Sequence, residues 1–130
     1  QQRSSAASDV YKRQQQYANI RYYLASDNSI SFDLTNANKV TLDVYMPSDG
    51  LTGSQDNKLW LKLQNGNKER PWEGQITKEQ AVELDKWQRL TFDFSDQSSA
   101  TEFTRMLVQF NGENNFDSVK AYIDNVFIHR

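Results

Sequence analysis

Apolar and polar residues alternate with a period of two along much of the chain, and this pattern restricts the fold more than any other feature of the sequence. Segment 40–46 (VTLDVYM) carries an apolar side chain at every second position. The same alternation recurs over 58–64, 90–94 and 106–110, while 121–128 is largely apolar on both sides. Because successive side chains of a β-strand point to opposite faces, these segments are predicted to be strands.

Two weaker regions add to this pattern. Segments 20–24 and 30–34 are predicted to pair as a hairpin across an Ala-Ser-Asp-Asn turn. Segment 79–84 is ambiguous, because Thr77 and Gln80 have the spacing of a helix capping box, but we favour a strand there. Turn signals recur about every ten residues, so the sequence predicts an all-β domain built as an antiparallel two-sheet β-sandwich.

The composition argues against several classes of function. The chain of 130 residues is long enough for one compact domain, and it lacks the roughly 20 consecutive apolar residues of a membrane-spanning helix. With 15 basic against 17 acidic residues, it has no positive excess of the kind that favours nucleic acid. It contains no cysteine and a single histidine, His129, which argues against a catalytic triad or a multi-histidine zinc site. We therefore expect no nucleic-acid partner and no membrane association.

The first residues differ from the rest of the chain. Residues 4–14 (SSAASDVYKRQ) resemble the in-frame translation of a transposon adapter used in sequencing libraries. We expect residues 1–14 to be an artefactual, disordered tail and residues 15–130 to be one β-sandwich domain, truncated at its N-terminus. Without the tail the domain keeps 12 basic and 16 acidic residues, so it is more acidic than the whole chain.

Three segments of the sequence form a pattern by their order and spacing. They are 40–48 (VTLDVYMPS), 86–95 (KWQRLTFDFS) and 122–126 (YIDNV), with a further strand at 61–65 (LKLQN) between the first two. Together they resemble the carbohydrate-binding-module-like jelly rolls of the galactose-binding-like superfamily, over about residues 34–128. The opening strand that such modules usually have, with its acidic residue, is not visible here.

The resemblance implies a jelly roll that binds sugar without cleaving it. Such modules accompany secreted bacterial enzymes that degrade polysaccharides. The implied partners are therefore a polysaccharide or oligosaccharide and a covalently attached catalytic domain, and the implied location is secreted or on the bacterial cell surface. The alternative is a structural or protein-interaction sandwich that binds no sugar.

Catalysis is not expected of this chain. Glycoside hydrolysis generally uses two carboxylates, but Asp33, Asp43 and Asp93 follow the strand alternation as ordinary solvent-facing residues do. Neither a nucleophile elbow nor a glycine-rich phosphate loop occurs in the sequence. We predict that the domain is not an enzyme.

Aromatic side chains are the first candidates for sugar binding, because a ring face matches the apolar C–H face of a pyranose while nearby polar groups take its hydroxyls. Trp60 is predicted to point outward beside Lys62 and Gln64, and Tyr45 is out of phase with its apolar neighbours. Trp72 lies in a polar loop. For each ring, packing across strands or under a loop is the alternative.

A polar cluster closes the strand over 106–110. Gln109, Asn111 and Glu113, within the sequence QFNGENN, supply amides and a carboxylate suited to recognising hydroxyls. The alternative is an ordinary solvated turn that uses asparagine and glycine for positive φ. Trp87, at the start of a strand, is expected to be a packing residue, as the same position is in the modules that the chain resembles.

Asp124 is an acidic residue within the most apolar predicted strand, and a buried carboxylate needs a partner. In the modules that the chain resembles, an aspartate at this position often helps to hold a structural calcium ion, which prefers hard oxygen ligands. The resemblance therefore implies calcium as a cofactor, with Asp124 as a ligand. The alternative is a hydrogen-bonded or solvent-facing side chain.

Overall fold

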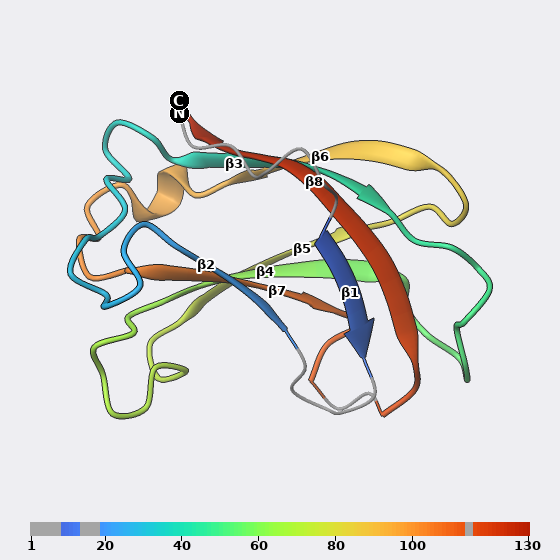
Figure 1. The fold of residues 1–130 in the computed structure, drawn as a ribbon. Helices are drawn as coiled ribbons and strands as arrows, with labels where there is room; N and C mark the ends of the chain where they lie inside the picture. Colours follow the sequence, from blue (N-terminus) through green and yellow to red (C-terminus); the bar gives the residue numbers. More distant parts are fainter. Residues whose placement is uncertain (1–8, 14–18, 114–115) are drawn as a thin grey trace.

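The structure is a computed structural model that describes residues 9–13, 19–113 and 116–130 of the chain. In these ranges the chain forms eight strands and one short 3₁₀ helix (Figure 1). They are β1 (Asp9–Arg13), β2 (Ile20–Tyr23), β3 (Lys39–Tyr45), β4 (Lys58–Gln64), β5 (Ile76–Ala81), β6 (Trp87–Asp93), η1 (Ser95–Gln97), β7 (Arg105–Phe110) and β8 (Val119–His129). No helix in the described ranges is long and apolar enough to span a membrane.

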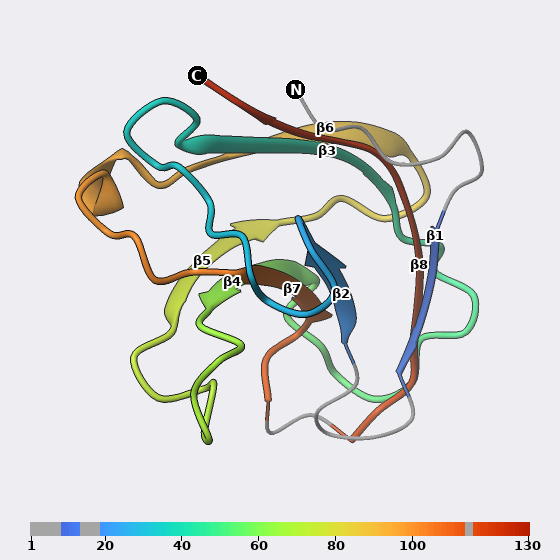
Figure 2. The ribbon, with the colours of Figure 1, turned by 60° about the vertical axis from the view of Figure 1, so that its left-hand side comes forward.

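The strands form two antiparallel sheets that pack face to face, as the sequence predicts. One sheet has the order β1-β8-β3-β6 and the other the order β2-β7-β4-β5. Figure 2 shows the two layers of strands. The fold is a β-sandwich of the jelly-roll kind. We call the first sheet the β8 sheet and the second the β7 sheet.

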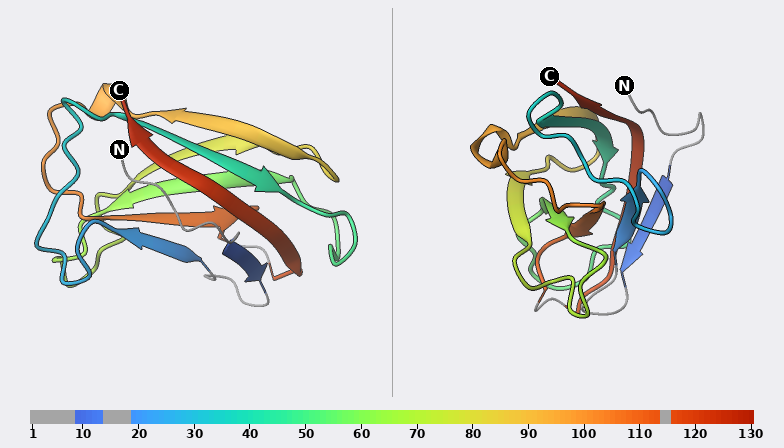
Figure 3. Two further views of the ribbon diagram at one scale, coloured as in Figure 1. Left: turned by 45° about the horizontal axis from the view of Figure 1, so that its top comes forward. Right: turned by 90° about the vertical axis from the view of Figure 1, so that its left-hand side faces the viewer.

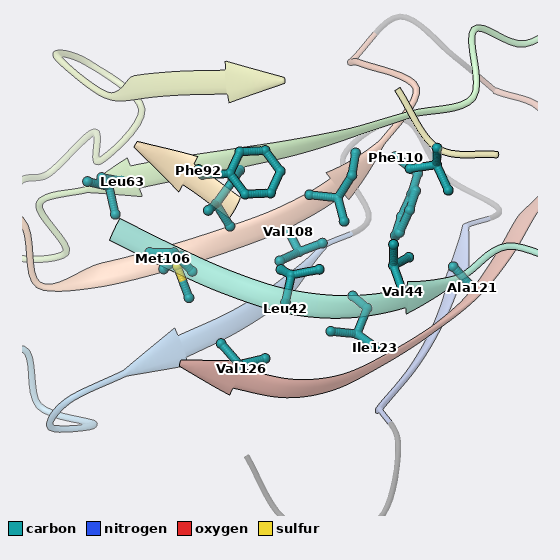
Figure 4. Close-up of a cluster of buried hydrophobic side chains, with 14 of the residues drawn as sticks. Leu42, Val44, Leu63, Phe92, Met106, Val108, Phe110, Ala121, Ile123 and Val126 are labelled. Atoms are coloured by element: carbon teal, nitrogen blue, oxygen red, sulfur yellow. The ribbon is translucent and has the colours of Figure 1, made fainter. Parts of the chain in front are cut away.

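The core contains the apolar side chains that the alternation assigns to the inner faces. Leu42 and Val44 of β3 point toward Val108 and Phe110 of β7 across the space between the sheets (Figure 4). Full burial of a large apolar side chain contributes about 1.5–3 kcal/mol to folding. The largest side chains buried in this way are Phe92, Phe94, Phe110, Leu42, Met46, Leu59, Leu61, Leu63, Met106 and Ile123.

The predicted hairpin between 20–24 and 30–34 is wrong. β2 pairs with β7 instead, and the segment around Phe32 is a loop whose backbone N–H donates to the carbonyl of Phe103 at 2.8 Å. Asp33 accounts for the loop, because its carboxylate accepts hydrogen bonds from the Thr35 backbone and the Asn36 side chain and closes a turn. The segment still buries Phe32 and Leu34, which is why it reads as a strand.

The ambiguous 79–84 region is a strand only in its first half, because residues 82–84 lie outside the strand. β5 begins at Ile76 and ends at Ala81, earlier than the predicted 79–84. Its partner is β4, with Thr77 opposite Lys62 and Glu79 opposite Trp60.

Part of the segment expected to be a disordered tail is a strand in this structure. Residues 9–13 form β1, which runs antiparallel to the first half of β8 at the edge of its sheet (Figure 3). Backbone groups at an open sheet edge accept an extended segment without requiring a particular sequence, which explains the difference. The rest of the expected tail, residues 1–8 and 14, lies outside the described ranges.

Candidate functional site

A groove of about 620 Å³ lies on the outer face of the β7 sheet. The groove follows from strand alternation. Leu61 and Leu63 of β4 point into the core, so Lys62 and Gln64, which alternate with them, point outward. We call it the β7 groove. Its lining residues are Asn19, Arg21, Lys62, Gln64, Trp72, Gln75, Arg105, Leu107, Gln109 and Glu113.

Strand register brings the outward side chains of three strands together. Gln64 of β4 stands opposite Arg105 of β7, and Lys62 stands opposite Leu107. Leu107 in turn stands opposite Arg21 of β2. Leu107 is buried and provides an apolar part of the groove lining between these polar side chains.

Arg105 is held in the groove by a chain of amide side chains. Its Nε and Nη2 atoms donate to Oε1 of Gln64 at 2.9 and 2.7 Å. The Nε2 atom of Gln64 donates in turn to Oε1 of Gln75 at 2.6 Å. Gln64 is almost fully buried, so this chain fixes the position of the guanidinium before any ligand arrives.

Lys62 is the most deeply buried cation of the groove, with only 2% of its surface exposed. Its Nζ forms an ion pair with Glu113, which reaches over from the loop after β7, and lies 5.7 Å from the centroid of the Trp60 ring. A buried charge is costly unless it is paired, so this contact ties the loop to the sheet.

Gln109 is 3% exposed, and its Oε1 atom is buried without a hydrogen-bond partner in the described part of the chain. A buried carbonyl oxygen left without a donor costs about 1–3 kcal/mol. Gln109 is one of the residues that line the β7 groove, so this cost arises at the groove.

Trp72 supplies the exposed ring of the groove. It lies in the 65–75 loop and is 59% exposed, although it lines the same cavity as the buried amides. The loop is fastened to a neighbouring turn, because Nδ2 of Asn67 donates to the carbonyl of Asn28 at 2.9 Å. An apolar ring and several amides thus face one space.

Trp60 does not line the groove, although it points outward as predicted. Its ring packs on the turn after β7: a Cβ atom at Gly112 would lie 3.1 Å from the ring atom Cζ2 of Trp60. Asn111, also a candidate from sequence, holds this turn. Its Oδ1 accepts a hydrogen bond from the Lys58 backbone at 2.8 Å, and its side chain also bonds that of Gln55.

Tyr45 lies on the opposite side of the sandwich, on the outer face of the β8 sheet. Its ring centroid is 5.7 Å from that of Trp87 and 6.3 Å from that of Tyr122. Trp87, expected to be a packing residue, is 51% exposed. We call these three rings the β8 aromatic patch. The structure therefore separates Tyr45 from the groove residues.

Asp124 stands opposite Asp43 of β3, next to an irregularity in the pairing of β3 with β8. Asn125, with a φ of 50°, turns its side chain toward Asp43 and donates to it at 2.9 Å, while its backbone N–H donates to Asp124 at 2.8 Å. Asp124 is thus half-buried and hydrogen-bonded within a β-bulge.

The surroundings of Asp124 offer few calcium ligands. Arg89 donates to both carboxylate oxygens of Asp43, at 2.8 and 3.1 Å, and these bonds hold the pKa of Asp43 below its usual range. Calcium takes about six to eight oxygen ligands. No group of three or more acidic or histidine side chains that could hold a metal occurs in the described ranges. The calcium site remains a prediction.

The groove thus gathers part of the predicted set and adds residues that the sequence analysis missed. Predicted candidates in the groove are Lys62, Gln64, Trp72, Gln109 and Glu113, whereas Trp60, Tyr45, Asn111 and Asp124 lie elsewhere. The residues missed are Asn19, Arg21, Gln75, Arg105 and Leu107. Arg105 and Leu107 share the phase of Gln109 along their strand, and that phase was the signal available to find them.

Comparison with known proteins gives two structural likenesses. No protein-family model matches the chain, and no curated protein matches its sequence. Among solved structures, it is similar to the protein described as SGBP-B from a complex xyloglucan utilization locus in Bacteroides uniformis, with 10% identity and a TM-score of 0.46 over 95% of this chain and 38% of that one. It is also similar to a structure described as "CBM4 structure and function", with 17% identity and a TM-score of 0.40 over 86% of this chain and 59% of that one. The chain spans less than two thirds of either protein.

Proposed function

We propose that this domain binds a polysaccharide or oligosaccharide in the β7 groove and does not cleave it. The observation that carries the proposal is the exposed Trp72, which lines the same groove as the amide residues Gln64, Gln75 and Gln109. A pyranose offers an apolar C–H face to a ring and hydroxyl donors to an amide oxygen at the same time. The strand motifs noted in the sequence support the same function.

The charges of the groove favour binding over hydrolysis. Glu113 is the one carboxylate among its described lining residues, and it is paired with Lys62. Hydrolysis of a glycosidic bond generally uses two carboxylates, one on each side of the scissile bond. The groove in this form supports recognition alone.

In this proposal the domain serves an attached catalytic domain in a secreted or cell-surface protein. Holding that enzyme on a polymer raises its effective concentration at the substrate without changing its chemistry. This part rests on the sequence resemblance.

The test is affinity electrophoresis of matched tryptophan variants. The wild type should be retarded by at least one gel among β-glucan, xylan, mannan and alginate. Trp72→Ala should weaken that retardation by about 1–3 kcal/mol of binding free energy, by analogy with rings that stack on bases. Trp87→Ala is the control, because it removes a ring of similar exposure from the opposite sheet. Absence of retardation on every polymer, or equal loss in both variants, would contradict the proposal.

A second function has one observation in its favour. The β8 aromatic patch places an exposed tryptophan beside two tyrosines, and exposed aromatic side chains are enriched in protein interfaces. A domain that uses this patch to pack against a neighbouring domain would need no sugar. Loss of a protein contact in Trp87→Ala, with no retardation of the wild type on any polymer, would favour this alternative.

A further inference from the structure

The β7 groove carries an excess of positive charge in an acidic domain. Its described lining includes Arg21, Lys62 and Arg105 against Glu113 alone, whereas the whole chain has a net charge of −2. Among the described lining residues, only Lys62 is paired with that carboxylate. Two arginine charges therefore remain without a carboxylate partner in the part of the chain that the structure describes.

Five cations outside the groove are paired with acids, whereas Lys39, Lys68, Lys120 and Arg130 form no ion pair with the described residues. Ion pairs outside the groove join Lys58 to Glu79, Arg70 to Glu73, Lys78 to Asp96, Lys86 to Glu83 and Arg89 to Asp43. The two groove arginines bond neutral amides instead: Arg105 bonds Gln64, and Arg21 donates from Nε to Oδ1 of Asn19 at 3.1 Å. An amide oxygen orients a guanidinium without neutralising its charge.

The two guanidinium groups are placed to act together. Arg21 and Arg105 project from neighbouring strands on the same sheet face, since Arg21 is opposite Leu107, two residues beyond Arg105. Diagonal neighbours of this kind are about 7–8 Å apart at the backbone, within the combined reach of two long side chains. Arg105 is already fixed by the buried Gln64, so little ordering is needed when an anion binds.

We propose that the ligand of the β7 groove is an anionic polysaccharide, whose carboxylates or sulfate esters bind Arg21 and Arg105. The inference rests on the proposed function and specifies its substrate class. Guanidinium forks match the planar oxygen pairs of carboxylates and also bind the oxygens of sulfate. The sugar face contacts Trp72, while the charged substituents reach the arginines on the floor of the sheet.

The experiment compares polymers that differ in charge on a common backbone. Polygalacturonate and highly methyl-esterified pectin share their sugar units, but esterification removes the negative charge. Alginate supplies a second carboxylated polymer, carrageenan supplies sulfate esters, and β-glucan and mannan are neutral. We expect strong retardation by at least one charged polymer and weak retardation by esterified pectin and the neutral polymers. Carboxylated and sulfated gels separate the two sources of negative charge.

Variants test whether the arginines carry this preference. Arg105→Gln and Arg21→Gln should each weaken binding to the charged polymer by about tenfold or more, the range for a charged hydrogen bond. Lys86→Gln is the control, because it makes the same change of net charge away from the groove. Raising the salt from about 0.1 M to about 1 M shortens the screening length from about 10 Å to about 3 Å and should weaken binding of the wild type more than that of Arg105→Gln.

The outcomes distinguish the inference from the function on which it rests. Retardation by neutral or esterified polymers equal to that by charged ones would overturn the anionic ligand and leave glycan binding in place. No retardation by any polymer would overturn both. Equal loss of binding in Lys86→Gln and Arg105→Gln would also overturn the inference, because the effect would then follow net charge rather than the groove.

Discussion

At the scale of single residues, Gln109 combines a cost to the fold with a use in the groove. Its buried Oε1 lacks a donor in the described structure, and a leucine of similar volume would remove that unsatisfied group. We expect Gln109→Leu to raise the free energy of unfolding by about 1 kcal/mol and to weaken retention on the polymer that the wild type binds. Urea unfolding and affinity electrophoresis measure the two effects.

Gln64→Leu is the matched control for that experiment. Gln64 faces the same groove, but its side chain bonds both Arg105 and Gln75, so its replacement leaves these partners unsatisfied. We expect this variant to lower the free energy of unfolding. If Gln109→Leu lowers it to the same extent, Gln109 has a structural partner and the interpretation of its oxygen is wrong.

The Asp43 carboxylate gives the domain part of its pH dependence. Hydrogen bonds from Arg89, and less so from Asn125, hold its pKa in the folded state below the ordinary value. A depressed carboxyl pKa stabilises the fold above the pKa of the unfolded chain, and this contribution is lost as the pH falls through the folded-state pKa. We therefore expect Asp43→Asn to be less stable than the wild type at neutral pH, and the difference to shrink in acid.

Urea unfolding between about pH 7 and about pH 2, a range that spans the titration of aspartate, measures this difference. Asp56→Asn is the control, because Asp56 is exposed and belongs to none of the ion pairs of the described residues. A gap between wild type and Asp43→Asn that stays constant across the range would show that the carboxylate contributes through packing and not through its charge.

Individual site residues could be predicted only as far as strand phase allows. The alternation along β4 correctly predicts that Lys62, Gln64 and Trp60 point to the outer face. It does not tell which outward side chains share a cavity, because that depends on which strands are neighbours. Arg21 reaches the groove only because β2 pairs with β7, a pairing that nothing in the alternation of either strand specifies.

At the scale of elements, the turn after β7 contains a glycine, Gly112, on which the Trp60 ring packs. Gly112 has a φ of +75°, and a Cβ atom there would also press on the Trp60 ring. Gly50 has a φ of +88°, but its Cβ would meet only ordinary contacts. A left-handed conformation costs an alanine about 1–2 kcal/mol, so both Gly→Ala variants should be destabilised, Gly112→Ala more strongly.

Urea unfolding compares the two glycine variants, and tryptophan fluorescence reports the environment of Trp60. We expect an altered emission spectrum in Gly112→Ala and an unchanged one in Gly50→Ala. Equal destabilisation with identical spectra would mean that the ring moves aside at no cost and that the turn does not position it.

Strands were easier to predict than their partners. Alternation identified β3, β4, β6 and β7 because each has one face in the core and the other in a polar environment. The same alternation led to the wrong prediction of a strand around Phe32. That segment buries apolar side chains at alternate positions, but its backbone follows a turn at Asp33. Burial pattern therefore predicts which side chains enter the core, but not whether the backbone between them joins a sheet.

At the scale of the whole molecule, the predicted calcium ion would appear as a change in global stability. A ligand that binds only the native state raises the free energy of unfolding by about 2.7 kcal/mol at a hundredfold excess over its dissociation constant. If Asp124 holds calcium, EDTA should lower the melting temperature of the wild type, and Asp124→Asn should abolish that sensitivity. A melting curve that EDTA leaves unchanged would remove calcium from the account of this fold.

The placement of Arg21 and Arg105 on neighbouring strands has a consequence for how charge is read along a polymer. Their separation is set by the sheet, so one ligand must present two anionic groups at a matching distance to engage both. On a randomly esterified polygalacturonate, the frequency of such pairs falls as the square of the free-acid fraction. On one esterified in blocks, it falls only in proportion to that fraction. Two pectins of equal mean charge would therefore bind unequally, and the domain would sort polymers by the sequence of their charges.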